Sequence, residues 1–164
     1  MKVLYLIRHA KSSWADPRLT DHDRPLNKRG KRDIPIMARR LASYTPRPEL
    51  IISSTARRAR KTARGIGDRL GFDKQEIVFI ESLYTFSREP LLEVIRSVQP
   101  TVTVLCVVGH NYGLTDCAEW LCGEDLGNIP TCGVVLMEIP VDDWKQICRG
   151  NGRLLRFDYP KLQG

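Results

Sequence analysis

Short hydrophobic runs alternate with helical patterns along this chain. Two of the runs are almost continuously apolar, and they cover residues 3–10 and 101–110. Such runs are typical of strands that are covered on both faces, as in a parallel sheet packed by helices. Further short runs predict strands at 49–53 and 77–80, and an antiparallel pair at 134–139 and 154–159 around a Gly-Asn-Gly turn.

Helical spacing of apolar residues lies between these runs. It predicts helices at 28–43, 56–70, 90–98 and 113–121. Pro35 must either sit in the first turn of its helix or kink it, and Gly71 ends the next one. The alternation predicts an α/β fold, a three-layer sandwich in which a mainly parallel sheet carries helices on both faces.

The length and the N-terminus set the expected context. At 164 residues the chain can bury a substantial core, and we expect a single domain over residues 1–164. Met1 and Lys2 lead directly into a strand without the regions of a signal peptide, and no apolar run approaches membrane-spanning length. We therefore expect a cytoplasmic protein without a membrane partner, and the sequence leaves its oligomeric state open.

The charge and the cysteines narrow the chemistry. A formal net charge of +7 invites an anionic partner, but the basic clusters at 28–32 and 57–64 have no interleaved aromatic residues to stack bases. This favours a small phosphate group over nucleic acid. The five cysteines show neither zinc-ligand spacing nor the Cys-x5-Arg phosphate loop, and the Walker A pattern is absent. We expect free thiols and neither metal nor cofactor.

Charged residues close both long apolar runs. Arg8 and His9 end the first run and His110 ends the second. Ligands of such sheets gather at the carboxyl ends of strands, and Arg58 falls in the first turn of a helix, whose N-terminus suits an anion. If the two strands are neighbours, these four side chains form a phosphate pocket. A neutral imidazole could then attack phosphorus, with arginines stabilising the oxygens.

The order of motifs resembles a known family. Four elements carry the resemblance, namely Leu6-Ile7-Arg8-His9-Ala10, Arg24-Pro25-Leu26 with Gly30, Ser54 to Thr62, and Gly109-His110-Asn111. They resemble the Arg-His-Gly, Pro-Leu-x-x-x-Gly, Ser-x-x-x-Arg-Ala-x-x-Thr and second-histidine motifs of the histidine phosphatase superfamily, whose fold is phosphoglycerate mutase-like. The short chain and the Arg-Pro-Leu element are most similar to the small phosphohistidine phosphatases of the SixA type.

The resemblance implies roles for individual residues. His9 would be the nucleophile of a metal-independent phosphatase that forms a covalent phosphohistidine. Arg8, Arg58 and His110 would hold the phosphoryl group, and Arg24 would add a further contact. The implied substrate is phosphohistidine on a phosphorelay-type protein. Two alternatives stay open: a phosphomonoesterase or pyrophosphatase acting on small metabolites such as nucleotide or sugar phosphates, and a phosphate-binding module without catalysis.

Departures from the family pattern bear on the substrate. Ala10 replaces the motif glycine, which is tolerated if its φ stays negative. Ala15 and Thr85 stand where mutase-like branches carry an asparagine and a carboxylate proton donor. An alkoxide leaving group needs a proton, whereas a protonated phosphoramidate nitrogen departs with little help, so phosphohistidine fits best. Whether Glu81 or Glu89 replaces the acid is left open by the sequence.

The remaining histidine and the three tryptophans are not expected to take part in the site. His22 lies between two aspartates in a polar loop and is expected to be a solvated residue. Trp14, Trp120 and Trp144 are expected to pack rather than to bind ligand.

Overall fold

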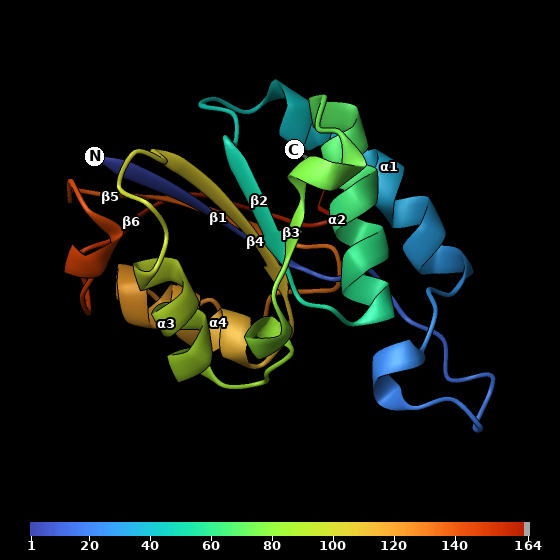
Figure 1. Cartoon of the computed structure of the whole chain (residues 1–164). Coiled ribbons are helices and arrows are strands. Elements are labelled where there is room, and N and C mark those ends of the chain that lie inside the picture. The colour runs from blue at the N-terminus through green and yellow to red at the C-terminus, as the bar shows by residue number, and fades with distance from the viewer. Residues whose placement is uncertain (163–164) are drawn as a thin grey trace.

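The computed structural model describes residues 1–162 and has the α/β architecture expected from the sequence (Figure 1). Its strands are β1 (Lys2–Arg8), β2 (Leu50–Ser53), β3 (Val78–Phe79), β4 (Val104–Gly109), β5 (Val134–Ile139) and β6 (Arg153–Asp158). Its helices are α1 (Lys28–Ser43), α2 (Arg57–Leu70), α3 (Arg88–Arg96) and α4 (Gly113–Cys122). Within the described residues, no helix is long and apolar enough to cross a membrane.

The strands form one mixed sheet. The order is β3-β2-β4-β1-β5-β6, with parallel pairing from β3 through β1. Strand β5 pairs antiparallel with both β1 and β6, which confirms the expected antiparallel pair at the C-terminal end. In the central pairing Arg8 lies opposite Gly109, so the carboxyl ends of β1 and β4 meet at one edge.

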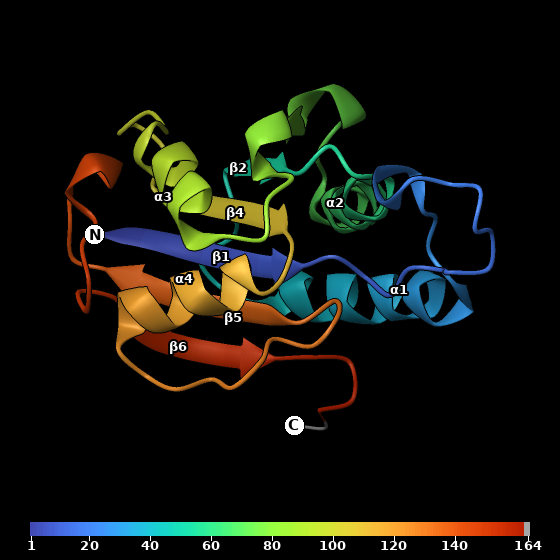
Figure 2. The ribbon, with the colours of Figure 1, turned by 90° about the horizontal axis from the view of Figure 1, so that it is seen from below.

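Alternate residues of β1 supply two separate cores. Tyr5 and Ile7 pack with the α1 and α2 side, whereas Leu4 and Leu6 pack with the α3 and α4 side. Because strand side chains point alternately to opposite faces, both faces of β1 are apolar and both are covered. Figure 2 shows the resulting layers, with the helices on either side of the sheet.

Local differences from the sequence expectations have simple causes. Pro35 lies well inside α1 rather than in its first turn. Strand β4 begins at Val104 instead of residue 101, and at this point the Glu49 carboxylate accepts hydrogen bonds from the Thr103 and Val104 amides. Among described non-glycine residues only Cys132 has a positive φ, so Ala10 meets the condition for replacing glycine.

The loop between β1 and α1 is fixed where it returns to the helix. The Asn27 side chain accepts a hydrogen bond from the Gly30 amide at 2.8 Å and caps α1. The Asn27 amide in turn donates to the Lys11 carbonyl at 3.0 Å. A Cβ atom on Gly30 would lie 2.2 Å from that carbonyl oxygen, so the crossing needs glycine. This contact explains the glycine four residues after Leu26.

Candidate active site

The four residues singled out at the strand ends and at the start of α2 do come together. Arg8, His9 and Arg58 line a cavity of about 290 Å³ at the carboxyl edge of the sheet. His110 lies beside them, with its ring centroid 5.1 Å from that of His9. The neighbouring ends of β1 and β4 therefore bring side chains about 100 positions apart into one site.

The hydrogen bonds of His9 fix its tautomer. Nδ1 lies 2.7 Å from the carbonyl oxygen of Ala10. A carbonyl oxygen only accepts, so Nδ1 carries the proton and, in the neutral ring, Nε2 carries the lone pair. The Nε of Arg58 lies 3.4 Å from this Nε2 and donates toward it. The nitrogen that carries the lone pair thus lies beside a guanidinium that can hold an anion.

Burial keeps His9 neutral. The side chain is almost enclosed, and this burial lowers its pKa to about 3, with the charges of Arg58 and Arg8 acting in the same direction. The amide of Ala10 donates to the Thr62 hydroxyl at 2.9 Å, which pins the backbone that binds Nδ1. Near neutral pH the Nε2 lone pair is therefore available.

Arg58 is fixed at the start of α2 by a single acidic partner. Its side chain is 2% exposed. Nη1 donates to the Asp21 carbonyl at 2.6 Å and Nη2 to the Asp21 carboxylate at 2.9 Å. These bonds orient the guanidinium so that its Nε faces His9 and its Nη2 lies 3.5 Å from Nδ1 of His110.

The contacts of His110 define the opposite tautomer. Nδ1 faces Nη2 of Arg58, which can only donate, so this nitrogen accepts. Nε2 then donates to the Ser54 hydroxyl at 2.8 Å. The ring is 1% exposed, and burial lowers its pKa to about 3. Both imidazoles of the site are therefore neutral near pH 7.

Two further arginines face the same cavity. Arg8 donates through Nη1 to the Ile129 carbonyl at 2.9 Å, and its buried Nε has no partner within residues 1–162. Arg24 donates to the Ser12 hydroxyl at 2.6 Å and to the Asp21 carboxylate at 3.0 Å. The expected cluster of three arginines is therefore assembled around one small space.

The sequence interpretation missed Asp21 and Tyr84. The Asp21 carboxylate accepts hydrogen bonds from Arg58, Arg24 and the Tyr84 hydroxyl, the last at 2.6 Å. Partial burial alone would raise the pKa of Asp21, but the hydrogen bonds from Tyr84 and Arg58 hold it well below its usual range. The sequence offered one signal for Asp21, namely its position three residues before Arg24. Oppositely charged side chains at that spacing can form an ion pair within one turn, as these two do.

The interpretation of Trp14 as a packing residue is wrong. Its side chain is 74% exposed and borders the cavity, where the guanidinium of Arg24 lies 3.5 Å from the ring centroid. His22 is half-buried rather than solvated, because it hydrogen-bonds Thr55 at 2.9 Å and packs edge-on against Tyr84. By contrast, Trp144 is fully buried, as expected.

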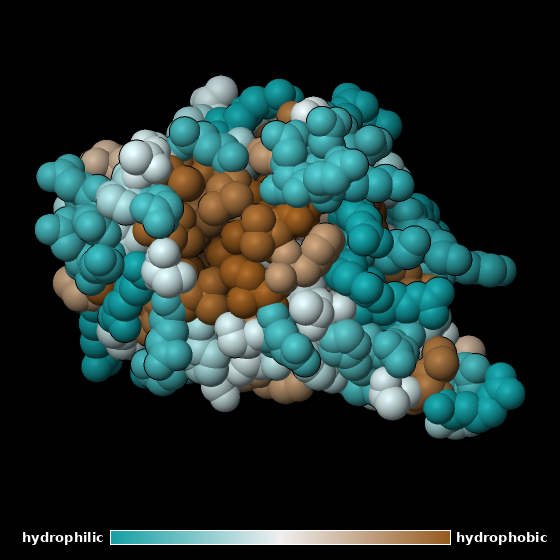
Figure 3. All heavy atoms as spheres, viewed as in Figure 1, coloured by the Kyte–Doolittle hydropathy of each residue, from teal (hydrophilic) through white to brown (hydrophobic). Residues whose placement is uncertain are grey.

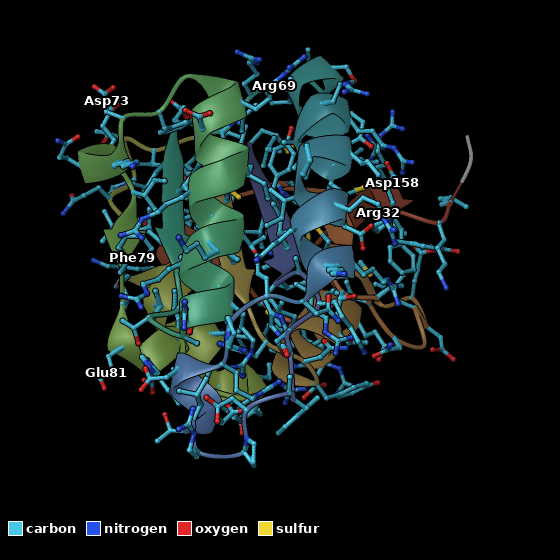
Figure 4. All side chains as sticks on the ribbon, turned by 90° about the vertical axis from the view of Figure 1, so that its right-hand side faces the viewer. Arg32, Arg69, Asp73, Phe79, Glu81 and Asp158 are labelled. Carbon is cyan, nitrogen blue, oxygen red and sulfur yellow. The ribbon has the colours of Figure 1, made fainter. Side chains whose placement is uncertain are left out.

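Neither glutamate considered as a replacement acid lines the cavity. Glu81 is exposed and extends from the periphery in Figure 4, and Glu89 pairs with Arg88 at 3.2 Å. The hydroxyl of Thr85 accepts from the Ser87 amide and so caps its own loop. Asp21 is thus the only carboxylate lining this cavity in the described part of the chain.

No metal-binding cluster accompanies the site. Among residues 1–162 no group of three or more His, Cys, Asp or Glu side chains is placed to hold a metal ion. The cysteines are unpaired, as expected, and Cys106, Cys117 and Cys132 are buried.

A pH titration followed by NMR tests the protonation of the site. Because both pKa values are lowered, we expect the ring resonances of His9 and His110 to stay in the neutral form from pH 8 to about pH 5, whereas an ordinary histidine titrates near 6.5. Single His9→Asn and His110→Asn variants assign the signals. A midpoint near 6.5 for His9 would contradict the neutral nucleophile.

Comparisons with known proteins place this geometry in context. The sequence model described as histidine phosphatase superfamily (branch 1) matches residues 4–84. An uncharacterized chloroplastic protein of Arabidopsis thaliana is 34% identical over 151 residues, covering 87% of this chain and 69% of the relative. With that plant relative named chloroplastic, the cytoplasmic location expected from the sequence stays a prediction.

Solved structures show the same fold. A crystal structure from Agrobacterium tumefaciens, named as a candidate phosphohistidine phosphatase SixA, is 34% identical and superposes with a TM-score of 0.81, covering 97% of this chain and 98% of the other. A protein histidine phosphatase SixA solved with tungstate is 20% identical, with a TM-score of 0.76 and coverage of 96% and 97%. The second likeness shows the fold alone.

Proposed function

Because the chain belongs to the histidine phosphatase superfamily, we propose that it is a phosphatase that hydrolyses phosphohistidine on a protein through a covalent intermediate on His9. The observation that carries the proposal is the protonation of the titratable side chains at the cavity, namely His9, His110 and Asp21. The neutral imidazole of His9, three arginines and the ionised carboxylate of Asp21 line the space for a phosphoryl group, and the neutral ring of His110 lies beside His9.

The state of Asp21 bears on the leaving group. Its carboxylate accepts hydrogen bonds from Arg58, Arg24 and Tyr84, and its pKa is held low, so it carries no proton to donate at neutral pH. An alkoxide leaving group without a proton donor loses about 10² to 10⁴-fold in rate. The imidazole of phosphohistidine, once protonated on its other ring nitrogen, leaves as a neutral molecule and needs no proton from the enzyme.

The first step transfers the phosphoryl group to the enzyme. The Nε2 lone pair of His9 forms a new bond to phosphorus while the bond from phosphorus to the substrate nitrogen breaks. The substrate ring is already protonated on its other nitrogen, so it takes the electron pair and leaves as neutral imidazole. The proton stays on Nδ1, hydrogen-bonded to the Ala10 carbonyl, so the phosphorylated ring carries a positive charge. Arg8 and Arg58 stabilise the phosphoryl oxygens as their charge redistributes.

The second step returns the enzyme to its starting state. A water oxygen bonds to phosphorus, the bond to Nε2 breaks, and His9 takes back its lone pair as a neutral ring. The water protons remain on the released inorganic phosphate and on solvent. The neutral ring expected at low pKa is a stable product of this step, which favours turnover.

Two observations support the choice among the alternatives. The Agrobacterium structure, which covers nearly the whole chain, bears a phosphohistidine phosphatase name. A phosphate-binding module without catalysis would have no use for a nucleophile whose tautomer is fixed by the Ala10 carbonyl and whose pKa is lowered. We therefore place hydrolysis of small phosphate esters second and silent binding third.

A comparison of substrates tests the proposal. We expect kcat/KM for a phosphohistidine peptide to exceed that for an alkyl phosphate such as glucose 6-phosphate by about 10² to 10⁴-fold, the usual contribution of a general acid. The activated ester 4-nitrophenyl phosphate, whose leaving group needs no proton, should fall between them. Rapid turnover of the alkyl phosphate with an inert phosphohistidine peptide would sink the proposal in favour of a metabolite phosphatase.

A further inference from the structure

A second cavity lies directly beside the candidate active site. It has a volume of about 340 Å³ and is lined by Pro25, Leu26, Lys31, Arg57 and Lys61, which we term the basic groove. Lys31 comes from α1, and Arg57 and Lys61 come from α2. Figure 4 faces the side of the molecule where these two helices run next to each other.

The groove combines an apolar floor with unpaired cations. Leu26 is largely buried in the core, whereas Lys31, Arg57 and Lys61 are exposed. None of the three cations lies within 4.0 Å of a carboxylate in the part of the chain that the structure describes. Arg57 makes one long hydrogen bond, 3.5 Å, to the Asp23 carbonyl. The groove therefore presents positive charge without an internal partner.

This arrangement of positive charges does not stabilise α2. Arg57 and Lys61 are four residues apart on α2, and like charges at that spacing destabilise a helix slightly. The first turn of α2 contains no acidic residue, although the helix dipole would favour one there. A purely structural surface gains nothing from this pattern, whereas an anionic ligand would relieve the repulsion.

The groove is continuous in sequence with the phosphate cavity. Pro25 follows Arg24, and Arg57 precedes Arg58, so each wall of the groove is one residue from an arginine of the candidate active site. A further cavity of about 420 Å³ begins at Lys61 and continues along α2 past Arg64. A chain whose phosphorylated side chain enters the cavity could thus extend along this side. Hydrophilic side chains cover the α2 side in Figure 3, while hydrophobic ones gather beside α3.

We propose that the basic groove docks an acidic segment of the phosphorylated protein, with carboxylates against Lys31, Arg57 and Lys61 and an apolar side chain on Pro25 and Leu26. The inference rests on the proposed function, since it assigns the site a protein substrate. Charge complementarity carries it, because none of the three cations pairs with a carboxylate within residues 1–162. A nucleic acid fits less well, since no aromatic side chain of residues 1–162 lines the groove to stack a base.

The test uses two synthetic phosphohistidine peptides of equal length, one with leucine, aspartate and glutamate around the phosphohistidine and one with alanine in their place. We expect the wild-type enzyme to show a KM about tenfold lower for the acidic peptide, with a difference that shrinks at high salt. The double variant Lys31→Glu/Lys61→Glu should abolish this preference while turning over 4-nitrophenyl phosphate as before, because neither lysine lines the phosphate cavity.

The matched control is Lys145→Glu/Lys161→Glu, which changes the net charge equally at exposed lysines outside the groove and should keep the preference. The docking proposal is overturned if both double variants lose the preference for the acidic peptide equally. It is also overturned if the groove variant keeps that preference unchanged. A groove variant that loses only affinity for a single-stranded oligonucleotide overturns it as well. A wild-type enzyme active on 4-nitrophenyl phosphate but inert on both peptides overturns the proposed function together with the docking.

Discussion

Replacing His9 with alanine is expected to lower kcat on phosphohistidine peptide by about 10³-fold or more, because the attacking nitrogen is lost and no second imidazole can take its place. The Nδ1 of His110 faces Arg58, and its Nε2 is bound to Ser54. His9 lines the phosphate cavity whereas His110 is not among the residues that line it, so His110 is not placed to attack phosphorus. Steady-state turnover of purified wild type and variant provides the measurement.

Two controls separate lost chemistry from lost structure in this experiment. Arg8 and Arg58 remain in the variant, so calorimetric binding of inorganic phosphate should persist near the wild-type affinity. His9→Asn keeps a polar side chain of similar size and should be equally inactive. Turnover that survives in both variants would remove His9 from the role of nucleophile.

Arg58→Ala is expected to have the second largest effect. Removing one preorganised donor from a charged transition state typically costs about 10² to 10³-fold in kcat/KM. Arg58 is such a donor, since Asp21 orients its guanidinium beside Nε2 of His9. Arg58→Lys retains the charge but not the planar fork, so we expect only partial recovery.

The same helix offers a matched control for this prediction. Arg69 is exposed in the last turn of α2, outside both cavities, and Arg69→Ala should leave kcat/KM unchanged. Denaturant unfolding of each variant shows whether the loss of the Asp21 pairing also affects stability. If Arg58→Ala and Arg69→Ala behaved alike, the phosphate-binding role of Arg58 would be wrong.

The sequence was most informative where a hydrophobic pattern is compatible with few arrangements of strands and helices. The continuous apolar runs ending in His9 and His110 require strands buried on both faces, and βα connections align such strands in parallel. Neighbouring carboxyl ends then follow, and with them the meeting of the two histidines. The apolar face of α2 placed Arg58 in the first turn of that helix, and the resemblance to the family's Ser-x-x-x-Arg-Ala-x-x-Thr motif singled it out from Arg57.

The parts that escaped prediction lie in the loop before α1. Its path depends on distant contacts, such as the Gly30 crossing over Lys11, which no periodicity encodes. The contact of Asp21 with Tyr84 joins segments 63 residues apart, and Trp14 is held outward by Arg24 instead of entering the core. Local pattern therefore brought His9, Arg8 and Arg58 together, but it did not reveal the Asp21 carboxylate that orients Arg58.

The central claim is covalent catalysis at His9, and trapping of the intermediate tests it most directly. Wild-type enzyme is mixed with a phosphohistidine peptide that carries labelled phosphate, quenched in alkali within the first turnover and digested for mass spectrometry. The account predicts label on the peptide containing His9, stable in alkali and lost in acid, and no label in His9→Ala. Label on another residue, or label that persists in His9→Ala, would contradict it.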